Sequence, residues 1–314
     1  MKVYLHQLRQ FVLLGIGLLT LGSCAGQDDL AQGRKLLQEQ KFPEAEAAFA
    51  KIIAGDDKRA DAWYYRGYAR FQQGAAQTAI PDFDKAITLA PQCKSCQDSL
   101  GRYHFQRGLA FFVSGNYGAG EADFQKCINL QHDLANAYAY VGVCKGFGGD
   151  DIAAIQALNT AVKTDPNNHF AWSNRGYYNS KVGDNRTAIA DFTKAISLKP
   201  DDKMSYLNRG YTYIGQQDYA TAMQDFQKAL EIDPEYAGAL TYMGIALTNT
   251  GRPQEALPYL DKAINATPQN GALFYYRGAA RINVGLKDLG CEDLQQALAL
   301  GDDQGVPLIQ EYCQ

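Results

Sequence analysis

A repeat of 34 residues runs through most of this chain and constrains its fold more than any other feature. From His104 onward, an aromatic or apolar residue recurs at every 34-residue step, and a glycine follows each one four residues later. Self-similarity at such a period is typical of a solenoid built from one supersecondary unit, so the length does not imply two globular domains. The recurring pairs are Trp63 and Gly67, His104 and Gly108, Tyr138 and Gly142, Trp172 and Gly176, Tyr206 and Gly210, Leu240 and Gly244, and Phe274 and Gly278.

The second half of each unit also has a fixed pattern of small residues, one large apolar residue and often a proline, as in Ala188, Phe192, Ala195 and Pro200. Glycine and alanine let two helices approach closely, and proline ends the second helix because it cannot continue the hydrogen-bond ladder. We therefore predict eight helix–turn–helix units in residues 26–304. They start near residues 26, 60, 101, 135, 169, 203, 237 and 271.

Two segments depart from the repeat. Seven residues, 94–100, are inserted before the third unit, and we expect them to lengthen its first helix. After the eighth unit, residues 305–314 contain a further short helix, Val306 to Tyr312, which we expect to cap the last hydrophobic face.

The register of these residues resembles the tetratricopeptide repeat, and the resemblance covers nearly the whole chain after the first 25 residues. It implies an all-α solenoid, a right-handed superhelix of paired helices whose first helices line a concave surface. It also implies a scaffold that binds another protein rather than an enzyme.

Arginine recurs at the seventh place of five units and aspartate at the twenty-third place of the same five units. The turn between the two helices lies near the fifteenth place, so these two positions are level across the hairpin. We predict a salt bridge inside each of these repeats, in which the planar guanidinium binds the carboxylate with two hydrogen bonds. The pairs are Arg66 with Asp82, Arg107 with Asp123, Arg175 with Asp191, Arg209 with Asp225, and Arg277 with Asp293.

Six positions on each first helix line the concave surface in this family, namely the second, fifth, sixth, ninth, twelfth and thirteenth. In this chain they are rich in aromatic residues and nearly free of charge. Tyrosine combines apolar area with a hydroxyl at small entropic cost, which suits partner recognition, although several rings could instead pack between repeats. The candidate partner-binding residues are Tyr64, Tyr65, Tyr68, Phe105, Tyr140, Phe170, Asn174, Tyr177, Asn208, Tyr211, Tyr242, Tyr275 and Tyr276. The cations that would clamp an acidic C-terminal tail are missing, which disfavours such a ligand.

The first residues resemble a bacterial lipoprotein signal peptide, residues 1–23, ending in Leu21-Gly22-Ser23 before Cys24. The resemblance implies cleavage before Cys24 and lipidation of this cysteine, with fatty acyl chains such as palmitate that anchor residues 24–25 in a membrane. No aspartate follows Cys24 directly, which favours the outer membrane. The sequence leaves open whether the protein faces the periplasm or the cell surface.

Six further cysteines remain, an even number in an oxidising compartment. Cys291 and Cys313 lie level across the final hairpin, and we predict a disulfide between them. Cys93 and Cys96 form either a local disulfide or pairs with Cys127 or Cys144, which the sequence does not decide.

Composition and motifs exclude several functions. Cleavage would leave 28 basic and 34 acidic side chains, a mildly acidic balance without a basic block that disfavours nucleic acid as a partner. No catalytic motif, metal site or cofactor site is recognisable. We expect a membrane-anchored scaffold for a protein or peptide. The alternatives are a glycan- or peptidoglycan-binding solenoid and a purely structural, self-associating envelope protein, and the oligomeric state stays open.

Overall fold

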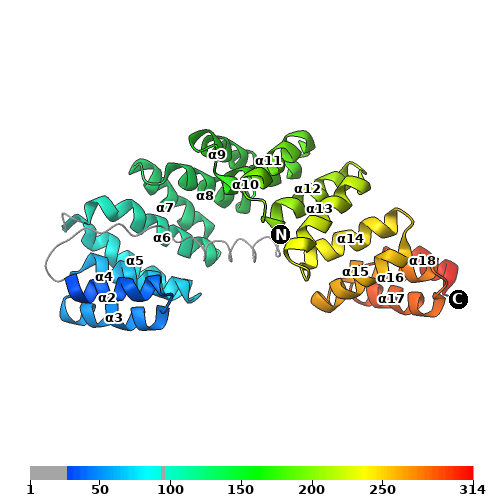
Figure 1. Ribbon diagram of the computed structural model, residues 1–314, viewed down its shortest axis with the longest axis horizontal. Helices are drawn as coiled ribbons and strands as arrows, with labels where there is room; N and C mark the ends of the chain where they lie inside the picture. The colour runs from blue at the N-terminus through cyan, green and yellow to red at the C-terminus, as the bar shows by residue number, and fades with distance from the viewer. Residues whose placement is uncertain (1–26, 93–95, 314) are drawn as a thin grey trace. The chain divides into compact units, whose positions relative to one another are not determined.

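The computed structural model describes residues 27–92 and 96–313, and within them every regular element is a helix (Figure 1). The helices alternate as the first (A) and second (B) members of successive hairpins. The A helices are α2 (Gln27–Gln38), α4 (Ala60–Gln72), α6 (Leu100–Val113), α8 (Leu134–Phe147), α10 (His169–Lys181), α12 (Lys203–Gly215), α14 (Ala237–Asn249) and α16 (Gly271–Asn283). The B helices are α3 (Phe42–Gly55), α5 (Ala76–Leu89), α7 (Tyr117–Asn129), α9 (Asp151–Thr164), α11 (Asn185–Leu198), α13 (Tyr219–Ile232), α15 (Pro253–Ala266) and α17 (Lys287–Ala299).

The A helices begin within one residue of the unit starts expected from the sequence, so the predicted all-α repeat fold is confirmed. The insertion before the third unit behaves differently from our expectation. It does not lengthen α6, which has 14 residues, as does α8. One short 3₁₀ turn, η2 (Gln97–Ser99), lies in the described part of this segment instead, and another, η1 (Ala90–Gln92), precedes it.

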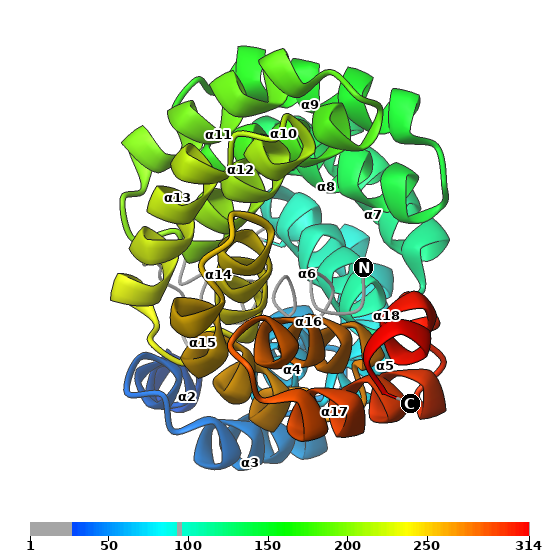
Figure 2. The ribbon, with the colours of Figure 1, turned by 90° about the vertical axis from the view of Figure 1, so that its right-hand side faces the viewer.

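The described chain divides into two units, which meet within α10 between Asn174 and Arg175. In the first unit, the hairpins α2–α3, α4–α5, α6–α7 and α8–α9 stack in chain order. In the second unit, α12–α13, α14–α15 and α16–α17 stack in the same way, and α18 (Val306–Tyr312) lies against α17 (Figure 2).

Local sequence explains the turn inside each hairpin. The fifteenth residue of every unit has a left-handed backbone, which favours glycine, and six of the eight are glycines, for example Gly74 at φ 80°. Many B helices then begin at an acidic or amide residue that accepts a backbone hydrogen bond, as when Asp218 accepts from the Thr221 N–H at 3.1 Å. The sequence thus specifies both the turn and the start of the second helix.

Close approach of the two helices builds the core. Each B helix inserts one large side chain, such as Phe192 or Phe226, which is fully buried. It lies under the glycine of the A helix: a Cβ at Gly210 would lie 2.6 Å from the Cε1 atom of Phe226. Any side chain at this place would push the helices apart, which explains the regular glycine.

Candidate partner-binding face

Several candidate aromatic residues are packing residues rather than surface residues. Tyr64, Tyr65 and Tyr140 are 4%, 7% and 9% exposed. The Tyr64 ring lies 4.7 Å from that of Tyr103, which belongs to the next A helix, and burial raises the pKa of the Tyr64 phenol well above its usual value. Tyr140 lies between the ring of Phe124 and the ring of Phe170, each at 4.9 Å. The prediction that these three tyrosines contact a partner is wrong, because neighbouring repeats already cover them.

The two asparagines of the predicted face also differ from each other. Asn174 is 3% exposed, and its Nδ2 donates to the Phe170 carbonyl within its own helix at 2.7 Å, so it is not available to a ligand. Asn208 is partly exposed, and its Nδ2 atom is buried without a hydrogen-bond partner among the described residues. A buried amide donor without an acceptor is costly, so the Asn208 side chain would gain from turning this nitrogen toward an acceptor on a ligand.

The other candidates remain at least partly exposed. Tyr211 on α12 is 52% exposed, and its ring lies 5.1 Å from that of Tyr242 on α14. Tyr242 in turn stacks on the buried Phe226, which fixes its position. The remaining partly exposed candidates are Tyr68, Phe105, Phe170, Tyr177, Tyr275 and Tyr276.

In the second unit, exposed and partly exposed candidates lie on the three successive A helices α12, α14 and α16, and Tyr177 lies on α10. We call the set on α12, α14 and α16 the A-helix face and define it by Asn208, Tyr211, Tyr242, Tyr275 and Tyr276. None of the six face positions on any of these three helices carries a charged residue. A surface of this composition binds through apolar contact and neutral hydrogen bonds rather than through ion pairs.

The arginine–aspartate pairs lie apart from this face, between the helices of each hairpin. Each arginine donates from Nε and Nη2 to both oxygens of the aspartate sixteen residues later. In the pair of Arg209 and Asp225 these distances are 2.9 and 2.7 Å. The same two-bond geometry holds Arg66 to Asp82, Arg107 to Asp123, Arg175 to Asp191, and Arg277 to Asp293. These arginines fix the register of the hairpins and are not ligand contacts.

In several of these arginines, the third guanidinium nitrogen donates a hydrogen bond to a residue of the preceding repeat. The sequence pattern alone did not predict this contact. Nη1 of Arg209 donates to the Thr193 hydroxyl at 2.9 Å, and Nη1 of Arg277 donates to Asp261 at 2.8 Å. Arg107 likewise contacts Asp84 at 2.7 Å. The acceptor is in each case the twenty-fifth residue of the preceding unit, a regularity that is visible in the sequence once the contact is known.

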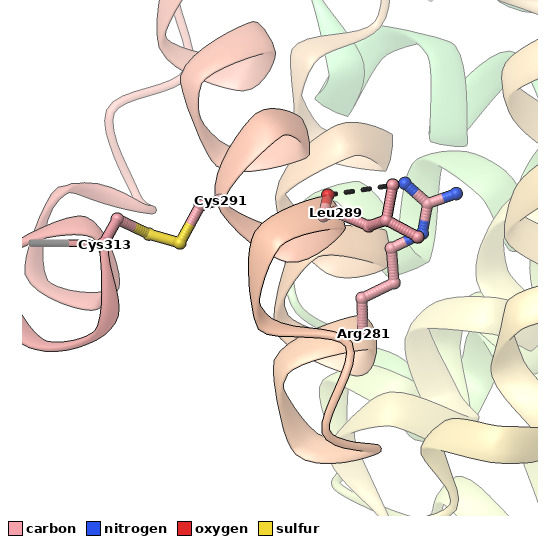
Figure 3. The surroundings of a disulfide bond; sticks show 4 residues. All are labelled: Arg281, Leu289, Cys291 and Cys313. Carbon is pink, nitrogen blue, oxygen red and sulfur yellow. Dashed lines mark hydrogen bonds between the residues drawn. A yellow bond between two sulfur atoms is a disulfide. The ribbon is translucent and has the colours of Figure 1, made fainter.

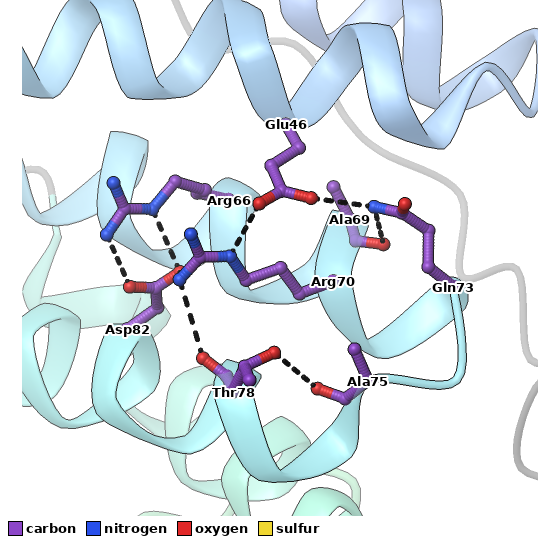
Figure 4. Close-up of polar contacts among 8 residues, drawn as sticks. All are labelled: Glu46, Arg66, Ala69, Arg70, Gln73, Ala75, Thr78 and Asp82. Atoms are coloured by element: carbon purple, nitrogen blue, oxygen red, sulfur yellow. Dashed lines mark hydrogen bonds and ion pairs between the residues drawn. The ribbon is translucent and has the colours of Figure 1, made fainter.

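A second type of link joins the first two hairpins (Figure 4). Arg70 on α4 donates to Glu46 on α3 at 2.7 Å and also to Asp82 at 3.0 Å. Gln73 donates to the other oxygen of Glu46 at 2.9 Å. Burial opposes ionisation of Glu46, but the hydrogen bonds from Arg70 and Gln73 outweigh it and lower the pKa of this carboxyl.

Comparison with known proteins identifies the repeat. A family model described as tetratricopeptide repeat matches residues 30–92 and 174–237, and a second model of the same description matches residues 213–276. The chain is a tetratricopeptide-repeat protein.

Solved structures of tetratricopeptide-repeat architecture are similar in fold. The Cut9–Hcn1 hetero-tetramer of the APC/C has a TM-score of 0.64 at 14% identity, and the match covers 100% of this chain and 60% of that chain. PilF of Pseudomonas aeruginosa has a TM-score of 0.58 at 19% identity, with 69% and 94% covered. A tetratricopeptide repeat protein from Parabacteroides merdae has a TM-score of 0.57 at 14% identity, with 81% and 96% covered. At these identities the similarity shows the fold alone.

The cysteines of this tetratricopeptide-repeat chain fall into two groups. Cys291 and Cys313 form a disulfide with a Cα–Cα distance of 5.6 Å, which fastens the end of α18 to α17 (Figure 3). Cys96 is also disulfide-bonded, whereas Cys127 and Cys144 are buried free thiols. Pairing of Cys96 with either of these two thiols is therefore excluded. Cys93 and the predicted lipidation site, Cys24, lie outside the described residues.

The described part of the chain offers neither a candidate membrane span nor a candidate metal site. No helix there is sufficiently long and apolar to cross a membrane. Residues 27–92 and 96–313 also contain no group of three histidine, cysteine or acidic side chains that could hold a metal ion.

Proposed function

We propose that this protein is a non-enzymatic scaffold that binds a protein or peptide partner through the A-helix face of its second unit. One observation carries the proposal. The exposed Tyr211 ring lies on the same helix as Asn208, whose amide donor has no partner, on a face without charge. Tyr211 would supply apolar contact, and Asn208 would turn its buried amide nitrogen outward to donate to a backbone carbonyl of the partner.

A solved structure of similar fold is the APC/C hetero-tetramer of Cut9 and Hcn1. We extend only the general role of a scaffold to this chain. The partner itself is characterised by its chemistry, which is a neutral segment with apolar side chains and accessible carbonyl groups.

The test compares two exposed tyrosines of the second unit. Tyr211→Ala removes the ring from the A-helix face, whereas Tyr312→Ala removes a 36% exposed ring from α18, a helix that carries no residue of this face. Chemical crosslinking in the producing cells, followed by mass spectrometry, should show that Tyr211→Ala loses a partner which Tyr312→Ala keeps. Because a single interface tyrosine contributes about 1–2 kcal/mol or more, we expect roughly a tenfold loss of affinity.

Salt and glycan controls separate the alternatives. A partner held by an uncharged face should remain bound between low and high ionic strength. Equal crosslinking of the two tyrosine variants would place the interaction elsewhere. Glycan-array binding that depends on Tyr211, without any protein partner, would favour the carbohydrate-binding alternative, and concentration-dependent self-association without another partner would favour a structural role.

We further propose that Cys24 anchors the protein in the outer membrane through acyl chains. The lipobox-like sequence before Cys24 supports this proposal. Cys24→Ser should move the protein from the membrane to the soluble fraction, and globomycin should block maturation. Unchanged membrane association of the Cys24→Ser variant would contradict the anchor without affecting the proposal for the A-helix face.

A further inference from the structure

The last helix, α18, lies in register with the repeat. The eighth unit starts at Gly271, so the period of 34 residues places the next start at residue 305, one residue before α18 begins. A complete A helix such as α16 has 13 residues, whereas α18 has 7. α18 therefore corresponds to the first half of a ninth A helix.

α18 covers the end of the second unit less completely than an A helix covers the repeat before it. α16 contributes buried residues such as Leu273 and Ala280, whereas α18 contributes none. The twenty-eighth residue of a repeat shows the difference. Leu230 and Ile264 are 8% and 7% exposed at this place in the sixth and seventh repeats, but Leu298 is 47% exposed in the eighth.

The segment that leads into α18 nevertheless closes over one apolar side chain. A Cβ at Gly305 would lie 2.8 Å from the Cδ2 atom of Leu294 on α17 and 3.5 Å from the Cδ2 atom of Tyr275 on α16. Leu294 is 0% exposed. If α18 and Gly305 moved away together, Leu294 would lose this cover and Tyr275 would lose a neighbour.

The backbone of α18 gives it little stability of its own. Its hydrogen bonds include those from the Ile309 N–H to the Gly305 carbonyl at 3.0 Å and from the Cys313 N–H to the Ile309 carbonyl at 2.9 Å. Gly305 precedes the helix and offers no side-chain cap. Helices shorter than about 12 residues are marginal by themselves in water, so α18 depends on what holds it from outside.

A disulfide supplies this external support. It joins Cys291 on α17 to Cys313, which follows the last residue of α18, over a sequence separation of 22 (Figure 3). By the chain-entropy estimate, closing a loop of this length raises the population of the docked state by about a hundredfold or more. Both cysteines are partly exposed, so a reductant has access to the bond.

We propose that α18 is a redox-released cap, which leaves α17 when a dithiol reduces the disulfide between Cys291 and Cys313. One thiolate of the dithiol attacks a cysteine sulfur and forms a mixed disulfide, and the other cysteine leaves as a thiolate that takes up a proton. The second thiol of the reductant then displaces the first cysteine. The dithiol is oxidised to a disulfide, and both cysteines become thiols.

Release of the cap opens the end of the second unit. Leu294 becomes exposed beside Leu298, so that α17 presents two leucines to solvent, and reoxidation restores the closed end. The end of the solenoid thus responds to the balance of dithiols and disulfides around the protein. This inference does not rest on the function proposed for the A-helix face, because it concerns only the position of α18.

The test measures hydrogen exchange of the full chain by mass spectrometry, with and without dithiothreitol at one pH. We expect the segment 305–313 to exchange about a hundredfold faster in the reduced protein and to slow again after reoxidation. The amides of α12 and α13 should exchange at the same rate in both states. Equal exchange of segment 305–313 in the oxidised and reduced proteins would overturn the proposal.

Two variants separate this disulfide from the one that involves Cys96. Cys291→Ser with Cys313→Ser should show fast exchange in segment 305–313 without any reductant. The matched control, Cys96→Ser, removes the other disulfide and should keep slow exchange until dithiothreitol is added. The proposal is also overturned if the double serine variant stays as protected as the wild type. Loss of protection in α12 and α13 on reduction would overturn it too, because the disulfide would then hold the whole unit rather than α18.

Discussion

Removing the arginine of one ion pair should destabilise its hairpin far more than replacing both partners. We select Arg209 and Asp225 because the Asp225 carboxylate has no other side-chain partner among the described residues. The side chain of Asp225 is 6% exposed and that of Arg209 is 18% exposed. In Arg209→Met, the aspartate is left almost fully buried without a partner. The hydrogen bond to Thr193 that links this repeat to the preceding one is lost as well.

The magnitude follows from this burial. Breaking a buried ion pair from one side typically costs about 3–5 kcal/mol, because one charge loses its partner but stays out of water. Asp225→Asn should cost less, about 1–3 kcal/mol, because the more exposed arginine keeps Thr193 and can reach water. The double variant Arg209→Met with Asp225→Tyr copies the seventh repeat and leaves no unpaired charge, so it should lie within about 1–2 kcal/mol of the wild type.

Because repeat proteins can unfold locally, the assay must resolve single hairpins. Hydrogen exchange of the α12 and α13 amides in the wild type and the three variants gives the local opening free energies. The double variant should retain about 1–4 kcal/mol more of this free energy than Arg209→Met, and exchange in α4 and α5 serves as the internal control. If Arg209→Met and the double variant lose the same protection, the buried charge does not determine the cost and our reasoning is wrong.

Three further predictions concern other parts of the repeat. Gly210→Ala should cost about 1–3 kcal/mol in chemical denaturation, because its Cβ would clash with a buried ring, whereas Gly215→Ala at the end of the same helix meets open space and should be neutral. Burial raises the pKa of the Cys127 thiol to about 12, so iodoacetamide at pH 8 should alkylate it only after unfolding; rapid labelling of the native protein would contradict the buried position. Burial opposes ionisation of Asp123, but hydrogen bonds from Arg107 and His104 outweigh it and lower the pKa of this carboxyl. The contribution of the ionised Asp123 to stability is therefore present above a pH of about 4 and is lost as the pH falls through the pKa of the folded state. Thermal unfolding of Asp123→Asn should therefore lose part of the acid sensitivity of the wild type, and an identical pH profile would refute this assignment.

The sequence specifies the hairpins well because the same local interactions recur in every repeat. Gly210 over Phe226, a left-handed residue at the turn and a capping aspartate such as Asp218 each have a direct local cause, and they recur at fixed spacing. The insertion before α6 has no such repetition. Its described part forms one short 3₁₀ turn, η2, instead of a longer helix, an outcome that periodicity does not predict.

The surface is less predictable than the fold, because exposure depends on the size of neighbouring side chains. Tyr140 and Tyr242 are each the sixth residue of their repeats, the fourth and the seventh. Tyr140 has rings of both the preceding and the following repeat against it, whereas the rings against Tyr242, Tyr211 and Phe226, both belong to the preceding repeat. Helical periodicity predicts the face of the helix on which a ring lies. It does not predict how large the side chains are that the adjacent repeats pack over this ring. The same reason explains why Tyr211 could not be distinguished from the buried Tyr64 by sequence alone.

The contacts across the joints show how one substitution changes two properties together. An arginine at the seventh place binds its own aspartate with two nitrogens and the preceding repeat with the third, so a planar, rigid group determines both the hairpin and its stacking. Met243 satisfies none of these bonds. The polar contacts across this joint include Lys262 with Glu235 at 3.2 Å, an exposed pair, and the Nη1 atom of Arg252 on the sulfur of Met223 at 3.9 Å. Because exposed pairs contribute little, the seventh repeat stacks on the sixth mainly through buried apolar side chains such as Leu240 and Leu247, whereas a joint with arginine adds a directional link to the same packing.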